Sequence, residues 1–510
     1  MTSDPSNAPS LRERVVSGVV WLTATRAFGQ IITWIITIFV VRLLSPEDYG
    51  LMGMAIVFTG VLFLLNEIGL GAAIVQKAEL STDQLSDLRW LILGTNAALA
   101  LLLVGLAPLA AVYFAEPRLV AIVRALSLTF LINGIGVPSA SILQREMAFK
   151  EKSAAEAAGN VTAAFATLIL AWSGYGVWSL VIGNLVLRFV TNAVYCFYRR
   201  PVFRRSFSFS NVGLFLNFGF QVAASRILWY FASTSDVLIV GRVLGSVQLG
   251  YYSLAFQYSS LPLEKFVTIL NEIAFPSFSS VQAQTERLQR HFLKLVHFVA
   301  LATFPMFIGL ALVADSAVYT LLGEKWLPIV LPLKLLCVVS CFRAIETINA
   351  PVTFARGRPR VVVSNTLLTA LVLPLSFYLG ARQGGILGVA LAWLIVRPLL
   401  FAIVTYRTLS ILELSVARYM SGVWHPVAGS LAMAAIVMTV NLYLGSMSSV
   451  GRLVVCSLVG CLAYAAYNVL FNSAALHEVK KTLLMRTPGR PLRLSEERYR
   501  LRRPQATQER

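Results

Sequence analysis

Residues 91–114 read LILGTNAALALLLVGLAPLAAVYF, a run without a single charged side chain. At 1.5 Å per residue, a helix of this length reaches about 36 Å, which is enough to cross a hydrocarbon core of about 30 Å. The run lacks the alternation of apolar and polar residues that a strand of an outer-membrane barrel needs. It therefore predicts a transmembrane helix.

Runs of the same kind recur along nearly the whole chain. Hydrophobic residues make up 57% of the 510 positions and charged residues only 13%, well below the roughly 25% charged residues of a typical soluble domain. We therefore predict an all-α polytopic membrane protein with about fourteen transmembrane helices. They are expected at residues 13–44, 49–75, 88–114, 119–141, 153–172, 176–198, 213–244, 249–274, 291–314, 328–350, 361–380, 386–406, 423–445 and 452–472.

The basic residues indicate the orientation of these helices. The formal net charge of +19 would favour a nucleic-acid partner in a soluble protein, but here most Lys and Arg lie in alternate short loops and in residues 473–510. By the positive-inside rule, this pattern predicts that both termini are cytoplasmic, and we expect no nucleic-acid partner. The predicted outside loops hold only Arg118, Lys325, Arg382 and Arg452.

The sequence also repeats itself. An ungapped shift of 200 residues aligns two arginines and a glycine that are not generic membrane residues, and a later glycine and arginine keep their spacing. We therefore predict two duplicated six-helix bundles around a central cavity (residues 1–205 and 206–410), two additional transmembrane helices (411–472) and a basic cytoplasmic tail (473–510). The matched pairs are Arg26 with Arg226, Arg42 with Arg242, Gly50 with Gly250, Gly176 with Gly385, and Arg188 with Arg397.

Charged residues inside the spans are the candidate functional residues. A charge at the bilayer centre costs roughly 2.5 kcal/mol or more, which implies a hydrated cavity or internal pairing. Arginine forms bidentate hydrogen bonds with phosphate oxygens, so the excess of arginines predicts a cavity for an anionic, phosphate-bearing ligand. The predicted substrate-binding residues are Arg26, Arg226, Arg188, Arg397, Arg343 and Arg124, and the candidates for ion coupling are Glu67, Asp236, Glu272 and Glu346.

The simpler alternative is that these charges pair permanently and serve only packing. Arg343 and Glu346 are three residues apart, so they could neutralise each other on one helix face. Asparagines inside the spans, among them Asn192, Asn349 and Asn365, are expected to bond between helices or to meet sugar hydroxyls in the cavity. The sequence does not decide between these alternatives.

No metal, cofactor or nucleotide site is expected. The five cysteines lie in apolar spans, where they behave as small hydrophobic residues, and no histidine accompanies the closely spaced Cys337 and Cys341. The sequence contains no Gly-x-x-x-x-Gly-Lys-Ser/Thr motif for ATP. The longest predicted outside loop, near residues 315–327, leaves little room for catalysis, so we predict a protein that is not an enzyme.

Several short motifs resemble bacterial polysaccharide transporters of the Wzx type. The stretch VRLLSPEDYG at residues 41–50, followed by NEIGLGAA at 66–73, resembles the start of these proteins. LQREMAF at residues 143–149 and FPSF at 275–278 fit the same pattern. The resemblance extends over roughly residues 10–410 and places the chain in the multidrug/oligosaccharidyl-lipid/polysaccharide (MOP) exporter superfamily.

The resemblance implies a flippase of the bacterial inner membrane. Such a protein moves undecaprenyl-pyrophosphate-linked oligosaccharide units to the outer leaflet by alternating access, for exopolysaccharide or lipopolysaccharide O-antigen export. Membrane lipids are implied partners, and a polysaccharide polymerase and other assembly proteins are further candidate partners.

Three alternatives remain at this point. A flippase for the peptidoglycan lipid precursor carries similar chemistry and is not excluded by the arginines. A cation-coupled multidrug exporter of the same superfamily would favour an acidic cavity instead. An O-antigen polymerase or ligase would need a larger external loop.

Overall fold

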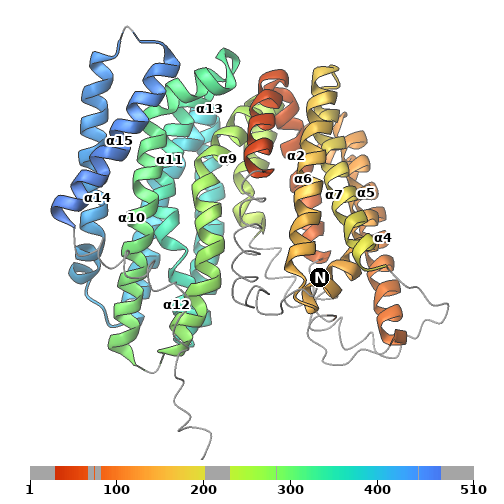
Figure 1. Ribbon diagram of the computed structural model, residues 1–510, viewed down its shortest axis with the longest axis horizontal. Helices are drawn as coiled ribbons and strands as arrows, with labels where there is room; N and C mark the ends of the chain where they lie inside the picture. The colour runs from red at the N-terminus through yellow and green to blue at the C-terminus, as the bar shows by residue number, and fades with distance from the viewer. Residues whose placement is uncertain are drawn as a thin grey trace, which may run out of the picture.

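The computed structural model describes residues 29–66, 74, 82–200, 230–282, 284–445 and 447–472. Within these ranges the chain is built from helices, and eleven of them are long and apolar enough to cross a membrane. The helices stand side by side in one layer-like bundle (Figure 1). The predicted class, an all-α multi-pass membrane protein, is confirmed.

Four of the five long helices of the first half pack mainly with one another, whereas α2 packs most extensively against α9 (Ser235–Ser280) of the second half. Contacts join α4 to α5, α6 to α7 and α5 to α7. A shorter apolar helix at residues 29–43 precedes them. The bounds are α2 Pro46–Asn66, α4 Thr82–Phe114, α5 Leu119–Arg145, α6 Phe149–Trp172 and α7 Val177–Tyr198.

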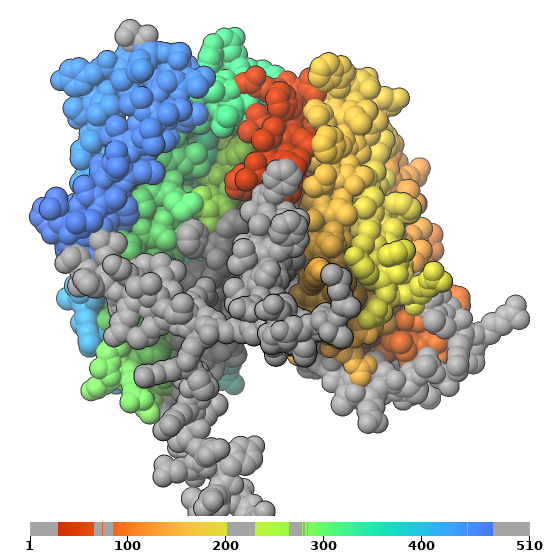
Figure 2. All heavy atoms as spheres, in the orientation of Figure 1, coloured from red at the N-terminus to blue at the C-terminus, as the bar shows by residue number. Residues whose placement is uncertain are grey.

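The second half is also a series of long helices. Its helices are α9 Ser235–Ser280, α10 Thr285–Ala317, α11 Val330–Glu346, α12 Asn349–Ala355 and α13 Pro359–Ile411, and two short helical turns, η3 Val318–Leu322 and η4 Glu324–Ile329, link α10 to α11. Two final helices, α14 Val416–Tyr443 and α15 Ser449–Phe471, pack against α10 and form one flank of the molecule (Figures 1 and 2).

Two breaks explain why fourteen predicted spans correspond to fewer helices. Gly245 breaks α9 with φ of 83°, and Gly384 and Gly385 break α13. Each of these helices therefore contains parts of two predicted spans. All fourteen spans overlap a described helix, although the first and seventh are described only at their ends.

The glycine breaks follow the sequence repeat. Gly176, at the start of α7, has φ 52° and ψ −130°, and the repeat-related Gly385 has φ 58° and ψ −142°. Residues with a Cβ rarely adopt this conformation, so the glycine pair fixes the same turn into the last core helix of each half. Arg188 and Arg397 then lie twelve residues, or about 18 Å, along equivalent helices.

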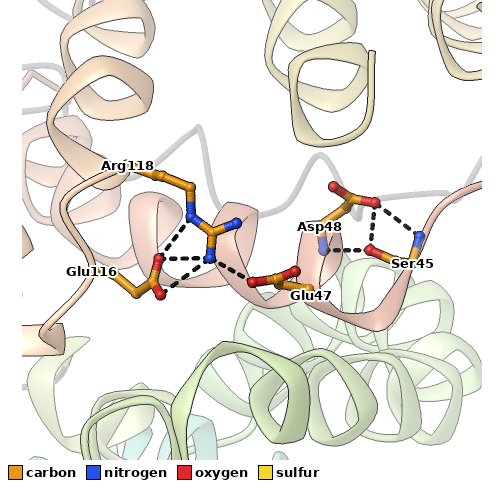
Figure 3. A network of polar contacts seen from close by, with 5 residues as sticks. All are labelled: Ser45, Glu47, Asp48, Glu116 and Arg118. Atoms are coloured by element: carbon orange, nitrogen blue, oxygen red, sulfur yellow. Dashed lines mark hydrogen bonds and ion pairs between the residues drawn. The ribbon is translucent and has the colours of Figure 1, made fainter. Parts of the chain in front are cut away.

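The N-terminus of α2 is fixed by a capping box. Ser45 donates its backbone N–H to Asp48 Oδ2 over 2.8 Å, and the Asp48 backbone N–H donates to Ser45 Oγ over 3.2 Å (Figure 3). These reciprocal bonds satisfy backbone donors that a helix start leaves without partners. The motif Ser-Pro-Glu-Asp at residues 45–48 thus ends the first predicted span and starts the second.

The boundary between the two six-helix bundles and the basic cytoplasmic tail stay predictions. The boundary proposed at residues 205–206 and the tail at residues 473–510 lie outside the described residues. The cytoplasmic placement of the two termini is likewise a prediction. In Figure 1 the predicted outer side is at the top, where α14 joins α15.

Candidate functional site

A pocket of about 360 Å³ lies in the second half, among α9, α11, α12 and α13. Its charged residues are Arg343, Glu346 and Arg397, and its aromatic residues are Phe256 and Trp393. Three of the predicted site residues, from two helices far apart in sequence, therefore meet at one site. The pocket extends from Arg397, near the middle of its span, to Thr353 and Thr408, near the predicted cytoplasmic ends of α12 and α13.

Arg343 is held by neutral groups. Its Nη1 donates to Ser260 Oγ over 3.1 Å, and its Cζ lies 4.8 Å from the ring centre of Phe256 and 5.7 Å from that of Trp393. Such cation–π contacts orient a guanidinium without cancelling its charge. Among the described residues no carboxylate lies within ion-pair distance of Arg343, although the charges of Asp236 and Glu346 act on it from further away.

Glu346 pairs with Arg397, not with Arg343. Arg397 Nη2 lies 2.8 Å from Glu346 Oε2, and the two side chains are only 14% and 17% exposed. The interpretation that Arg343 and Glu346 neutralise each other is therefore wrong. The position on one helix face permits that pair, but the tertiary packing of α13 against α11 offers Glu346 the Arg397 guanidinium instead.

A chain of hydrogen bonds connects the pocket to a buried acid. Trp393 Nε1 donates to the Tyr252 hydroxyl over 2.9 Å, and Tyr252 donates to Asp236 Oδ2 over 2.7 Å. Asp236 is 1% exposed and also accepts a bond from the Val237 backbone N–H. This acid, a predicted ion-coupling residue, is thus linked through two aromatic residues to the arginines of the pocket.

Arg188 and Arg124 lie in the first half, away from this pocket. Arg188 is half-buried on α7, its Cζ is 5.2 Å from the ring centre of Phe63, and its buried Nε has no hydrogen-bond partner. Arg124 is exposed on α5. The backbone symmetry between Arg188 and Arg397 is therefore not matched by their partners, because only Arg397 is paired with an acid within the described residues.

The other predicted site residues cannot be placed by the structure. Arg26, Arg226 and Glu67 lie outside the described residues. Glu272 lies on α9, but its side chain is not among those described. Their roles stay predictions.

Of the asparagines, two bond between helices as expected. Asn192 on α7 donates to Asn133 on α5 over 3.1 Å, and Asn349 on α12 donates to Thr405 on α13 over 3.2 Å. Asn349 also lines the pocket.

On the opposite, predicted outer side, the two halves close on each other. A Cβ on Gly50 of α2 would lie 1.8 Å from the Ser246 carbonyl oxygen, and a Cβ on Gly250 of α9 would lie 1.7 Å from that of Pro46. Real Cβ atoms do not approach closer than about 3 Å. Gly50 is related to Gly250, and Pro46 to Ser246, by the same shift of 200 residues, so the two contacts are copies of each other. Figure 2 shows residues 29–66, in red, where the two halves join.

Two repeat-related arginines extend this closure. Arg42 of the first half donates to the carbonyls of Thr320 and Leu321 in η3, which continues from the end of α10 in the second half. Arg242 of the second half donates to the carbonyls of Val112 and Tyr113, at the end of α4. Each positive charge thus meets the negative end of a helix in the other half.

Two further side chains of the second half donate hydrogen bonds to the first half. Lys325 Nζ donates to the carbonyl of Leu44 over 2.7 Å, and Trp326 Nε1 donates to that of Val41 over 3.0 Å. Trp326 is fully buried between the rings of Tyr49 and Tyr251. We call the contacts of Gly50, Gly250, Arg42, Arg242 and Trp326 the outer closure.

We expect the double variant Arg42→Ala/Arg242→Ala to open the outer closure. Each arginine contributes two hydrogen bonds between the halves, and losing both pairs should shift the open-to-closed ratio about tenfold. The measurement is the distance between spin labels at Leu43 and Val247, in protein whose native cysteines are replaced.

Arg118→Ala is the matched control for this prediction. Arg118 also lies on the outer side, but its ion pairs with Glu47 and Glu116 stay within the first half (Figure 3). The hydrogen bond with Glu47 holds the pKa of Arg118 above its ordinary value. Equal distance distributions in the double variant and in the unaltered protein would contradict the role of the two arginines.

The sequence did not predict every residue of the pocket or of the outer closure. Trp393 and Phe256 gave no signal, because aromatic residues are common in any apolar span. Arg42 and Arg242 were visible as a repeated pair, but they lie at the ends of spans and were not assigned a role. Their partners are backbone carbonyls, which no sequence pattern marks.

Comparison with known proteins agrees with this architecture. The chain is 28% identical over 460 residues to the teichuronic acid biosynthesis protein TuaB of Bacillus subtilis (strain 168), covering 89% of this chain and 95% of that protein. It is 26% identical to the lipopolysaccharide biosynthesis protein WzxC of Escherichia coli (strain K12), over 82% and 85% of the two chains. The structure of the lipid II flippase MurJ in an inward closed conformation superposes with a TM-score of 0.72 at 15% identity, over 90% of this chain and 100% of that one.

A family model described as polysaccharide biosynthesis protein matches residues 39–331, more than half of the chain. This match covers most of the first half, the residues of the outer closure and α9, one of the helices around the pocket. The chain belongs to the polysaccharide biosynthesis protein family.

Proposed function

We propose that this protein is a flippase of the bacterial inner membrane that carries undecaprenyl-pyrophosphate-linked oligosaccharides to the outer leaflet by alternating access. One observation supports this most directly. A pocket with arginines extends from mid-span towards the predicted cytoplasmic side, while repeat-related contacts between the halves close the predicted outer side. A transporter that loads substrate from the cytoplasm needs this arrangement in one of its states.

The charges of the pocket favour an anionic substrate. Among the charged residues that line the pocket, Arg343 and Arg397 outnumber Glu346, which forms its ion pair with Arg397. The buried Asp236 lies behind Tyr252 and Trp393, outside the lining. An exporter of organic cations would be expected to carry an acidic excess there. A guanidinium group matches phosphate oxygens in geometry as well as charge.

The test of this function is complementation. Expression in a bacterium that lacks its own exopolysaccharide flippase should restore glycan at the cell surface. A protein that inserts normally but leaves the glycan precursor on the cytoplasmic side would contradict the proposal.

A second candidate function is a flippase for the peptidoglycan lipid precursor, because the fold superposes on MurJ. We expect this protein not to sustain growth of cells depleted of MurJ. Growth under those conditions would favour the second candidate. The polymerase and other assembly proteins stay proposed partners, which co-purification from the complemented strain would test.

Arg26 and Arg226 stay proposed substrate residues. Each lies about 13 residues along the first span of its half, near the middle of the membrane, where two guanidinium groups could hold one pyrophosphate. We expect alanine at either position to impair export strongly and lysine to restore little, because an ammonium group lacks the planar fork. Near-normal glycan export from both inserted alanine variants would remove them from the site.

We further propose that Asp236 couples transport to an ion gradient, with Glu67, Glu272 and Glu346 as the other candidates. Asp236→Asn keeps the size of the side chain and can still accept the bond from Tyr252, but it cannot bind and release a proton. We expect an export rate lowered about tenfold and insensitive to collapse of the proton or sodium gradient. Asp315→Asn is the control, because Asp315 forms an exposed ion pair with Lys334; an Asp236→Asn protein that responds to both gradients like the unaltered one would exclude coupling through Asp236.

A further inference from the structure

The pocket in the second half has a wall of hydrogen-bond acceptors. Four of its threonines, Thr353, Thr366, Thr369 and Thr408, each donate their hydroxyl proton to the backbone carbonyl four residues earlier, over 2.7–3.0 Å. A hydroxyl has one proton, so each threonine oxygen is left with lone pairs only. While these bonds within the helices are formed, the four side chains offer a ligand acceptors and no donors.

Asn349 adds an acceptor that has no partner. It is 2% exposed and lines the pocket, and its Nδ2 is used by the bond to Thr405, whereas its Oδ1 has no hydrogen-bond partner. A buried polar atom without a partner is unfavourable, so a ligand that supplies a donor would be stabilised here. The Nε of Arg397 is a buried donor that also lacks a partner.

The donors and acceptors of the pocket distinguish the sugar part of the proposed substrate from its pyrophosphate. Phosphate oxygens only accept hydrogen bonds, so the oxygens of the four threonines and Asn349 Oδ1 do not bind them. The donors for phosphate in the lining are the arginines and the Asn365 amide, whose oxygen already accepts a bond from Arg407. A sugar hydroxyl donates one bond and accepts another, so it can use both the acceptors of the threonines and the donors of the arginines. The charged groups are also partly engaged, because Arg397 is paired with Glu346.

The size of the pocket sets the extent of the ligand. A volume of about 360 Å³ lies at the small end of the range for small-molecule sites, roughly 300–1,000 Å³. It suits a short part of an oligosaccharide and not a whole repeat unit.

We propose that this pocket is a sugar subsite that binds the hydroxyl-bearing rings of the lipid-linked oligosaccharide. Asn349 and the four threonines accept hydrogen bonds from sugar hydroxyls, and Arg343 and Arg397 provide the end that faces the anionic part of the substrate. The inference rests on the proposed function, because it assumes a carbohydrate bound to a lipid pyrophosphate.

The test compares two ligands on purified protein in lipid nanodiscs. One is undecaprenyl pyrophosphate, and the other is undecaprenyl pyrophosphate that carries a disaccharide. We expect the unaltered protein to bind the sugar-bearing lipid about tenfold more tightly. The double variant Thr353→Val/Thr369→Val, which removes two acceptors at nearly constant volume, should bring this ratio close to one without changing the affinity for the sugar-free lipid.

Thr303→Val is the matched control. Thr303 is fully buried on α10 and donates to the Val299 carbonyl over 2.8 Å in the same way, but it does not line the pocket. Its variant should keep the ratio of the unaltered protein.

The outcomes separate the two proposals. Equal binding of both lipids by the unaltered protein, or a ratio unchanged in the double variant, would overturn the sugar subsite and leave the flippase proposal standing. Binding of neither lipid would overturn the flippase proposal and the subsite with it. Displacement of the sugar-bearing lipid by tetraphenylphosphonium, with no preference for sugar, would identify the pocket as an organic-cation site and overturn the inference.

Discussion

Alanine at Gly50 or at Gly250 is expected to abolish glycan export. Neither position has room for one added carbon while the outer closure is formed, because that carbon would lie within 1.8 Å of a backbone oxygen of the other half. The neighbouring atom belongs to the backbone, so no side-chain rotation can relieve the overlap. The two halves would have to separate by more than 1 Å along their contact.

The consequence should be a transporter that cannot close its outer side. Such a protein would bind no substrate from the cytoplasm, or would bind it without completing a cycle. We therefore expect surface glycan near the level of the flippase-deficient strain. The distance between spin labels at Leu43 and Val247 should lengthen in the same variants.

Gly105→Ala is the control for both glycines. Gly105 lies in the middle of α4, and a Cβ there would meet nothing within 4 Å. Alanine is also the better helix former, so this variant should insert and export normally. Full export from both Gly50→Ala and Gly250→Ala would show that the closure does not form during transport.

The second large effect is expected at Arg397. Arg397→Ala removes a positive charge from the pocket and leaves Glu346 buried without its partner. An unpaired buried carboxylate is strongly unfavourable, and it would also repel a phosphate. We expect export to fall on the order of a hundredfold or more.

A companion variant distinguishes misfolding from loss of function. Arg397→Ala/Glu346→Gln removes both charges, so the pocket holds no unpaired carboxylate. It should restore membrane insertion and thermal stability but not export, because the guanidinium fork is still missing. Arg397→Lys should also fail to restore export. If the double variant exported glycan normally, Arg397 would have only a structural role.

The membrane spans could be predicted from sequence because hydropathy is a local property. Runs such as 91–114 lie in helices of the expected length, and the shift of 200 residues anticipated the matched breaks at Ser45 and Gly245. The number of separate helices was harder to predict. Gly384 and Gly385 have non-helical backbone angles and separate the two spans of α13 by a turn of only a few residues.

The residues of the pocket could be predicted from the sequence better than the contacts that they form with one another. Arg343, Glu346 and Arg397 were identified because charge is costly in a membrane, and the structure brings them together. Their pairing depends on how α13 packs against α11, which the spacing of residues on one helix does not determine. The acceptor wall was also hidden, because threonines in a span give no sign of which carbonyl takes their proton.

The outer closure has a further meaning for the origin of the chain. Gly50 meets Ser246 while Gly250 meets Pro46, so residue i of one half contacts residue j of the other and j contacts i. That reciprocity is the mark of an isologous interface, the kind formed by two identical subunits about a twofold axis. An ancestral six-helix chain could therefore have paired with its own copy through this surface, and gene fusion would have preserved a homodimer contact within a single polypeptide.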